Sequence, residues 1–267
     1  MPELGYDVSY FEPFRKGTRD SAMVVVPLVR DLLQPSTVVD VGCGLGTWLK
    51  VFEEQGVREV CGIDGAYVDP DALEIGAERF IAADLRTGLD DVDQRFDLAV
   101  SLEVAEHLPE QSAAGFVRGL TGLAPAVLFF AAIPNQGGRG HINEQWPEYW
   151  AAQFQPHDYV AVDCLRPMIW DNPRVQIWYA QNLLLFVERP LLERYPELKR
   201  WYECFRIRQL SIVHPRMFEW VLERPWHGLK ALSRSREAGI LTEEEFQVRK
   251  ARILSRMGGA EDRLKAP

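Results

Sequence analysis

The sequence predicts an α/β protein built on a doubly wound, mostly parallel sheet of seven strands. From residue 21 to residue 132, short apolar runs rich in β-branched residues alternate with segments of helical periodicity. Two more apolar runs, residues 159–164 and 182–187, follow without a clear helix-length amphipathic segment between them. We therefore expect a parallel sheet whose last two strands form an antiparallel pair.

Residues 1–36 are expected to form an arm and a helix that precede the sheet. Residues 6–14 carry Tyr6, Tyr10, Phe11 and Phe14 among acids. Two interpretations of this arm stay open: a lid over a substrate pocket, or a segment that its aromatic residues anchor to the core. A helix is predicted over residues 21–33, where apolar residues recur at helical spacing, and Pro35 ends it.

The first predicted strand, residues 37–41, leads into a turn rich in glycine. The glycines occupy alternate positions: Gly42, Gly44 and Gly46. A helix is predicted over residues 46–55, so a ligand could approach the bare backbone at the positive end of that helix. Asp40 precedes the glycines and would repel a pyrophosphate but attract a cationic ligand. S-adenosylmethionine (SAM), with its ammonium and sulfonium groups, is such a ligand.

Two more acids follow predicted strands. Asp64 comes after residues 60–63, roughly 20 residues past the glycine turn, where a carboxylate can accept from both hydroxyls of a ribose. Asp84 follows the third strand, residues 79–82, and could accept from the exocyclic amine of an adenine. Because parallel strands end at one edge of the sheet, we expect these acids to serve one ligand.

The fourth and fifth strands are predicted over residues 96–102 and 126–132, with a helix over residues 109–123 between them. Pro109 suits the first position of that helix. The loops after these strands carry the candidate chemical groups: Glu103, Glu106, His107, His141, Asn143 and Glu144. Both loops are expected at the carboxyl edge of the sheet, where they can converge.

The sequence changes character after residues 37–188, which form the predicted ligand-binding domain. Residues 189–228 are predicted to form helices broken by Pro196 and Pro215. Residues 229–257 predict a small hairpin of two helices, over 229–235 and 243–254, and residues 258–267 a disordered tail. A capping box of Thr242 and Glu245 begins the second helix, and the expected buried residues are Ile240, Leu241, Phe246, Ile253 and Leu254.

The composition is that of a globular protein. A formal net charge of −9 disfavours sequence-independent binding to nucleic acid or anionic membranes. The cysteines are scattered, the N-terminus lacks the pattern of a signal peptide, and the most apolar run, residues 124–133, is too short to cross a bilayer. We expect a cytoplasmic protein with a small-molecule substrate and no membrane partner.

Four motifs resemble those of class I SAM-dependent methyltransferases, over roughly residues 21–188. They are Val-Val-Asp-Val-Gly-Cys-Gly-Leu-Gly from Val38, Gly-Ile-Asp-Gly from Gly62, Ala-Asp-Leu from Ala83 and Ser-Leu-Glu-Val-Ala-Glu-His-Leu from Ser101. The resemblance implies a Rossmann-like sheet and SAM as methyl donor. It implies that Asp40 and the glycine turn hold the methionine end, Asp64 the ribose, and Asp84 with Leu85 the adenine. The implied SAM-binding residues are Asp40, Gly42, Cys43, Gly44, Gly46, Thr47, Trp48, Asp64, Gly65, Asp84, Leu85, Ser101, Leu102 and Glu103.

Two narrower resemblances concern the loop after the fifth strand and the C-terminus. Residues 135–150 resemble a subgroup of bacterial class I methyltransferases associated with glycan or natural-product pathways. Residues 236–254 resemble the short C-terminal (SHOCT-like) helical hairpin, which implies an interaction role. We therefore expect that these helices could support a homo-oligomer or a partner.

Two interpretations of the catalytic chemistry stay open. In the first, His107 or His141 is a general base for a hydroxyl or amine, and Glu103 is a further catalytic candidate. In the second, Glu103, Glu106, His107 and His141 bind a divalent cation such as Mg²⁺ or Mn²⁺, which would polarise an alcohol. This pattern is similar to that of metal-dependent small-RNA 2′-O-methyltransferases, although the basic RNA-binding parts of that family are not evident.

The leading hypothesis is methyl transfer from SAM to a hydroxyl of a sugar or secondary metabolite. Three alternatives stay open: an amine acceptor, an RNA 2′-hydroxyl, and a SAM-fold protein that recruits partners without catalysis. Trp146, Tyr149 and Trp150 could form an aromatic wall for the acceptor. Their helical spacing equally predicts a buried helix face.

Overall fold

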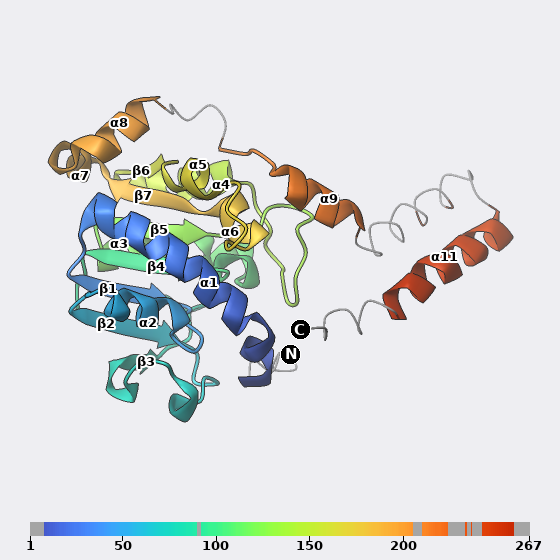
Figure 1. Cartoon of the computed structure of the whole chain (residues 1–267), viewed down its shortest axis with the longest axis horizontal. Coiled ribbons are helices and arrows are strands. Elements are labelled where there is room, and N and C mark those ends of the chain that lie inside the picture. Colours follow the sequence, from blue (N-terminus) through green and yellow to red (C-terminus); the bar gives the residue numbers. More distant parts are fainter. Residues whose placement is uncertain are drawn as a thin grey trace. The chain divides into compact units, whose positions relative to one another are not determined.

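The computed structural model describes residues 8–89, 92–204, 210–223, 233, 236 and 242–258. The chain divides into two compact units, Met1–Ile212 and Val213–Pro267 (Figure 1). The division falls inside the predicted extension, residues 189–228. No helix among the described residues has the length and apolarity needed to span a bilayer.

A seven-stranded sheet forms the centre of the first unit, in the order β3-β2-β1-β4-β5-β7-β6. β7 runs antiparallel to both of its neighbours, and the other pairs are parallel. The strands are β1 Thr37–Val41, β2 Glu59–Asp64, β3 Phe80–Ala82, β4 Leu98–Leu102, β5 Ala126–Phe130, β6 Tyr159–Val162 and β7 Leu184–Glu188. The predicted fold class is confirmed, and the strands match the apolar runs that predicted them.

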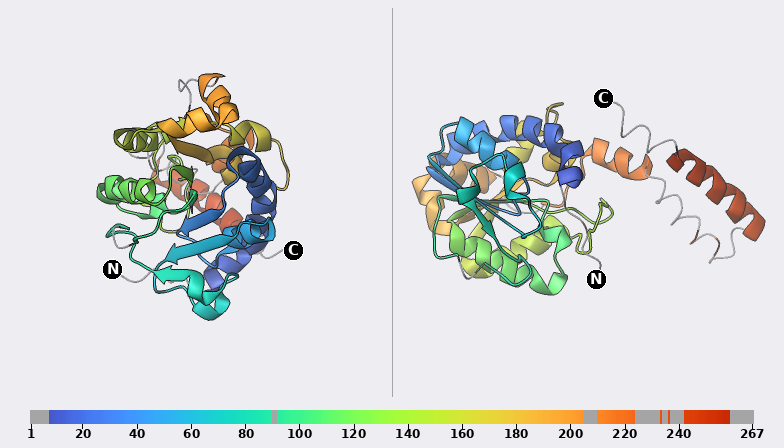
Figure 2. Two further views of the ribbon diagram at one scale, coloured as in Figure 1. Left: turned by 90° about the vertical axis from the view of Figure 1, so that its left-hand side faces the viewer. Right: turned by 90° about the horizontal axis from the view of Figure 1, so that it is seen from below.

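Helices cover both faces of the sheet (Figure 2). One face carries α1 Val8–Leu33, α2 Thr47–Glu54, α5 Leu165–Ile169, α6 Ile177–Asn182, α7 Arg189–Arg194 and α8 Pro196–Cys204. The other face carries α3 Ala113–Leu123 and α4 Pro147–Phe154. The two apolar layers leave the carboxyl ends of β1, β2, β4 and β5 at one edge, where the candidate site lies.

Two segments differ from the prediction. α1 begins at Val8, so most of the predicted arm is helical. Between β2 and β3, where the sequence predicted no helix, the chain forms the 3₁₀ turns η1 Pro70–Ala72 and η2 Ala77–Arg79. Between β6 and β7 the short helices α5 and α6 replace the expected hairpin. Helices this short show no amphipathic period in a sequence.

The second unit contains α9 Pro215–Glu223 and α11 Glu243–Gly258. The predicted capping box starts α11: Thr242 Oγ1 accepts from the Glu245 N–H at 3.3 Å, and Glu245 Oε2 accepts from the Thr242 N–H at 3.0 Å. Phe246 is buried as predicted, with the Arg236 guanidinium 4.5 Å from its ring centroid. The remaining predictions for this unit concern residues 229–232, 234–235, 240–241 and 259–267 and the side chains of Ile253 and Leu254, which lie outside the described part.

A buried arginine ties the segment after α8 to the sheet unit. Arg166 of α5 is fully buried and pairs with Asp163, with Nη2 2.6 Å from Oδ2 and Nε 2.9 Å from Oδ1. Its Nη1 also donates to the Leu210 carbonyl at 2.9 Å. Removing one partner of such a pair leaves a charge and a carbonyl without compensation.

We expect Arg166→Met to lower the free energy of unfolding by about 3 kcal/mol in urea titrations. The matched control is Arg189→Met, because the Arg189–Asp158 pair is half exposed and should contribute less than about 1 kcal/mol. Equal losses in the two variants would contradict this account of Arg166.

Candidate active site

The glycine turn after β1 depends on backbone angles that favour glycine. Gly42 has a φ of 85° and Gly46 a φ of 81°, both in the left-handed region. A Cβ on Gly42 would lie 2.2 Å from Cγ2 of Val104, so no side chain fits there. The turn leads directly into α2, as predicted. The other implied SAM-binding residues of this turn, all buried, are Cys43, Gly44, Thr47 and Trp48.

Asp64 ties the end of β2 to this turn. Its buried carboxylate accepts from the N–H groups of Gly44 at 2.7 Å and Gly65 at 2.6 Å. The Tyr67 hydroxyl donates to the same oxygen as Gly65. Burial raises the pKa of Asp64, although these three hydrogen bonds oppose the rise. Tyr67 was not predicted, and its hydroxyl makes the kind of bond that a ribose hydroxyl was expected to make.

Asp40 lies inside the sheet and is nearly inaccessible to solvent. Burial first, and the nearby Asp64 second, raise its pKa well above the usual value. A cation beside these two carboxylates would remove that penalty. The role of Asp40 toward a positively charged ligand group stays a prediction.

Asp84 was expected to accept from an adenine amine, but its carboxylate is already paired with a side chain of the protein. Arg86 holds its carboxylate, with Nε 2.8 Å from Oδ1 and Nη2 2.7 Å from Oδ2. These bonds lower the pKa of the Asp84 carboxyl, which is exposed to solvent. The following Leu85 is buried. An adenine amine would therefore compete with Arg86 for Asp84.

The end of β4 combines buried residues with an exposed acid. Ser101 and Leu102 are buried, and the Ser101 hydroxyl has no hydrogen-bond partner among the described residues. Glu103 has a φ of 61°, a strained value for a residue with a side chain. The protein around its carboxyl raises the pKa to about 7. Its side chain is nevertheless exposed, so hydration offsets part of that rise.

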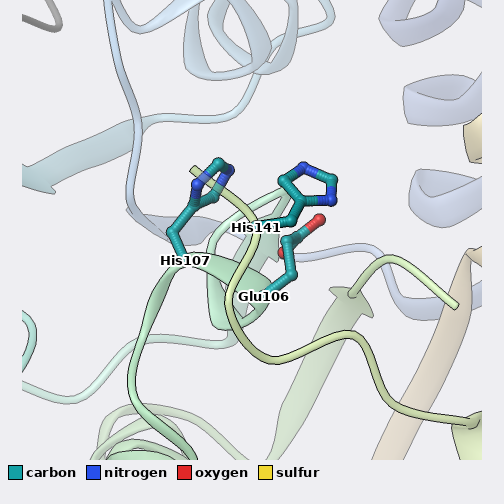
Figure 3. Close-up of side chains that lie close together, drawn as sticks. All are labelled: Glu106, His107 and His141. Carbon is teal, nitrogen blue, oxygen red and sulfur yellow. The ribbon is translucent and has the colours of Figure 1, made fainter. Parts of the chain in front are cut away.

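Three of the four predicted metal ligands converge (Figure 3). Glu106, in η3 Ala105–His107, lies with His107 and His141 so that one ligand atom from each falls within 4.8 Å of the others. The two imidazole rings are perpendicular, with centroids 4.8 Å apart. Glu103 is not a member of this cluster. Its left-handed backbone and exposed side chain set it apart from Glu106, which is fully buried.

Glu106 joins the loops that follow β4 and β5. Its Oε1 accepts from the Ala132 N–H at 3.1 Å, and its backbone carbonyl accepts from the N–H groups of Ile142 and Asn143 at 2.9 and 3.0 Å. Its Oε2 is buried without a hydrogen-bond partner in the described chain. Burial, with the charges of Glu103 and Glu144, raises the pKa of Glu106 to about 8.

The electrostatics of this cluster suit a cation. Burial, and the nearby His141, lower the pKa of His107 to about 4, so its imidazole is neutral at neutral pH. An unpaired carboxylate oxygen beside two imidazoles is a mixed donor set that divalent metal ions accept. The residues present therefore fit such an ion.

Glu144 orients His141. The His141 Nδ1 lies 3.0 Å from Glu144 Oε1, and Glu144 also accepts from the Asn135 N–H at 2.9 Å and from the Gly137 N–H. Burial opposes ionisation of Glu144, but these bonds outweigh it and lower its pKa. A carboxylate on one imidazole nitrogen fixes the tautomer and leaves the other nitrogen to a metal or a proton.

The predicted aromatic wall is only partly present. Trp150 belongs to the core, with its ring 5.3 Å from that of Phe129, and Tyr149 packs against Trp150. Of the three, Trp146 alone is exposed, and so is Ile142 in the same loop. The helix-core interpretation therefore holds for Trp150. Trp146 and Ile142 remain as exposed apolar side chains in the loop that carries His141.

Tyr179 is a second residue that the sequence did not predict. It lies on α6, and its ring packs edge-on against Trp48, with centroids 5.3 Å apart. Its only signal in the sequence was an aromatic run between the last two strands.

Comparisons with known proteins give one family and several distant relatives. The family described as "Methyltransferase domain" matches residues 19–167. A ubiquinone biosynthesis O-methyltransferase of Methylobacterium sp. (strain 4-46) is 34% identical over 116 residues, 41% of this chain and 45% of that protein. The chain spans about half the length of the curated relatives it matches.

Two solved structures are similar to this chain at low sequence identity. SAM-bound CalS10, an amino pentose methyltransferase of Micromonospora echinaspora, is 16% identical with a TM-score of 0.49, over 67% of this chain and 96% of that one. The methyltransferase domain of bacterial CtHen1-C is 18% identical with a TM-score of 0.46, over 63% and 97%.

We expect Gly138→Ala to displace the His141 ring, because the new Cβ would lie 2.1 Å from His141 Nε2. Histidine nitrogen NMR should show a loss of the single tautomer that Glu144 enforces. Gly115→Ala is the matched control, since its Cβ would meet nothing within 4 Å. An unchanged His141 spectrum in Gly138→Ala would contradict this packing.

Proposed function

Since the chain belongs to the methyltransferase domain family, we propose that it transfers a methyl group from SAM to a hydroxyl group of a small molecule, assisted by a divalent cation. The family implies SAM as methyl donor. The observation that carries the proposal is the convergence of Glu106, His107 and His141 in two loops that follow β4 and β5. β4 is the neighbour of β1, which leads into the glycine turn, and β5 is the next strand in the sheet.

The donor site consists of the glycine turn with Asp40 and Asp64. Asp64 accepts from the ribose hydroxyls, in place of the Tyr67 hydroxyl that it now binds. Asp40 faces the cationic end of SAM, where a positive charge stabilises its buried carboxylate. The protein alone raises the pKa of both carboxyl groups, so ligand contacts that favour the carboxylate forms would stabilise the bound state.

The metal site consists of Glu106, His107 and His141, with Glu144 as the residue that orients His141. A divalent ion there would act as a Lewis acid and make an acceptor hydroxyl easier to deprotonate. The buried Glu106 Oε2 supplies the charge and the two imidazoles supply nitrogen donors. Without a metal, His141 would be the better general base, because Glu144 fixes its orientation.

Three features support a small molecule as acceptor. The edge that carries the cluster is acidic, with Glu103, Glu106 and Glu144, which disfavours the phosphates of RNA. Ile142, which follows His141 in the sequence, and Trp146 of the same loop are exposed and offer apolar contact to an acceptor. The Methylobacterium relative is by name an O-methyltransferase of ubiquinone biosynthesis. The exposed Glu103 favours one alternative, an amine acceptor, because it could pair with an ammonium group.

We expect SAM to bind in calorimetry and Asp64→Asn to weaken it at least tenfold, because a carboxylate that accepts from ribose hydroxyls contributes roughly 1.5–3 kcal/mol. The matched control is Asp97→Asn. Asp97 also accepts from two backbone N–H groups, those of Ser36 and Thr37, but it lies where β1 begins, away from the carboxyl edge. If the wild-type protein does not bind SAM, the proposed SAM-dependent activity is refuted.

We expect the wild-type protein to bind Mn²⁺ and His141→Ala to lose this binding. Binding is measured as the decrease of the free Mn²⁺ signal in electron paramagnetic resonance. Glu144→Gln should weaken it roughly 10- to 100-fold, since it removes only the group that orients the ligand. His157→Ala, in η5 Gln155–His157, is the control and should bind like the wild type. Methylation that continues undiminished in excess chelator would rule out the metal and leave His141 as the base.

A further inference from the structure

The loop between β5 and α4, residues 131–146, carries His141 and needs contacts that hold its shape. Asn135, Gly137 and Gly140 have φ values of 70°, 66° and 78°, all in the left-handed region. Glycines in such a loop leave the backbone many alternative conformations. A metal ligand on this loop therefore keeps one position only where neighbouring elements anchor the loop.

A pair of buried side-chain amides anchors this loop on the side of β7. Asn182, the last residue of α6, donates from Nδ2 to Gln136 Oε1 at 2.7 Å, and both residues are at most 5% exposed. The same Gln136 oxygen accepts from the Ile133 N–H at 3.4 Å. Glu106 holds the loop on the side of β4. Since β4 and β7 are the two neighbours of β5, the loop is held from both sides.

The amide pair is connected to His141 through the two glycines that follow Gln136. The Gly137 N–H donates to Glu144, the residue that pairs with His141 Nδ1. The Gly138 backbone lies against the imidazole, since a Cβ there would be 2.1 Å from His141 Nε2. A shift of Gln136 would therefore disturb both contacts that fix the ring of His141.

The orientation of the Asn182 amide has a cost in stability. Gln136 Oε1 already accepts from the Ile133 N–H, so the nitrogen of Asn182 faces it and the oxygen points away. That oxygen, Oδ1, is buried with no hydrogen-bond partner among the described residues. An apolar side chain of similar size would avoid this cost. Stability alone therefore does not explain an asparagine at this position.

We propose that Asn182 and Gln136 are positioning residues for the metal site. Asn182 holds Gln136, and Gln136 holds the stretch of backbone that orients His141. This inference rests on the proposed metal-assisted function and adds a residue of α6, which lies beyond the segment that matches the family. The geometry of the metal site thus depends on the connection between β6 and β7, although that connection supplies none of its three ligands.

The test uses Asn182→Leu, which keeps a side chain of similar size and removes both the donor and the unpartnered oxygen. We expect this variant to bind Mn²⁺ roughly tenfold more weakly than the wild type in electron paramagnetic resonance, because contacts that orient a metal ligand contribute about that much. Histidine nitrogen NMR of the metal-free variant should show His141 as a mixture of tautomers. Gln136→Met should weaken Mn²⁺ binding similarly. The double variant should be no weaker than the single ones, since both residues act through one contact.

Asn172→Leu is the matched control. Asn172 also lies between β6 and β7, where its Oδ1 accepts from the Arg174 N–H at 3.0 Å. It should leave Mn²⁺ affinity and the His141 spectrum unchanged, and thermal melting of all variants checks that they fold. Unchanged Mn²⁺ affinity in folded Asn182→Leu would overturn the inference while the metal site stands. Wild-type protein that binds no Mn²⁺ would instead overturn the proposed metal site, and the His141 spectrum alone would then decide whether Asn182 positions that residue.

Discussion

The structure gathers carboxylates where water cannot fully solvate them, at the carboxyl edge of the sheet. Asp40, Asp64 and Glu106 are buried there, and Glu103 and Glu144 raise the pKa of Glu106 further. Such a group of acids destabilises the folded chain unless hydrogen bonds and cations compensate. Backbone amides of Gly44, Gly65 and Ala132 supply part of that compensation. The cations of SAM and a divalent metal ion would supply the rest, so the same arrangement explains both proposed ligands.

The metal cluster depends on backbone contacts more than on the sequence spacing of its ligands. The Glu106 carbonyl holds the second loop through the N–H groups of Ile142 and Asn143. Glu144 then fixes the loop at Asn135 and orients His141, while Gly138 leaves room for the imidazole. Some of these contacts join the two loops, and the others fix the local conformation of the second loop. Together they bring two histidines from separate connections into ring contact.

Much of this arrangement could be predicted from the sequence, for identifiable physical reasons. Buried parallel strands are continuous apolar runs, so β1 and β2 were readable, and with them the positions of Asp40 and Asp64 at one edge. The prediction that Glu103 belongs to the metal cluster was wrong. The backbone at Glu103 is left-handed, a conformation that depends on the tertiary structure and that the sequence spacing does not reveal. Tyr67 and Tyr179 were missed, since a turn residue and a helix as short as α6 carry no periodic signal. The Asp84–Arg86 pair was missed as well, because a loop conformation brings the two side chains together. The roles of these residues toward SAM remain predictions.

The central claim is that the methyl donor and a divalent ion meet at this edge. A crystal structure of the protein grown with S-adenosylhomocysteine and Mn²⁺, with anomalous scattering recorded for manganese, tests it most directly. We expect one manganese peak bound by Glu106, His107 and His141, and the amino-acid end of the nucleoside against Asp40. If the nucleoside binds at Asp40 and Asp64 but no manganese lies at the three ligands, the proposed metal site is contradicted. A nucleoside bound elsewhere would contradict the whole account.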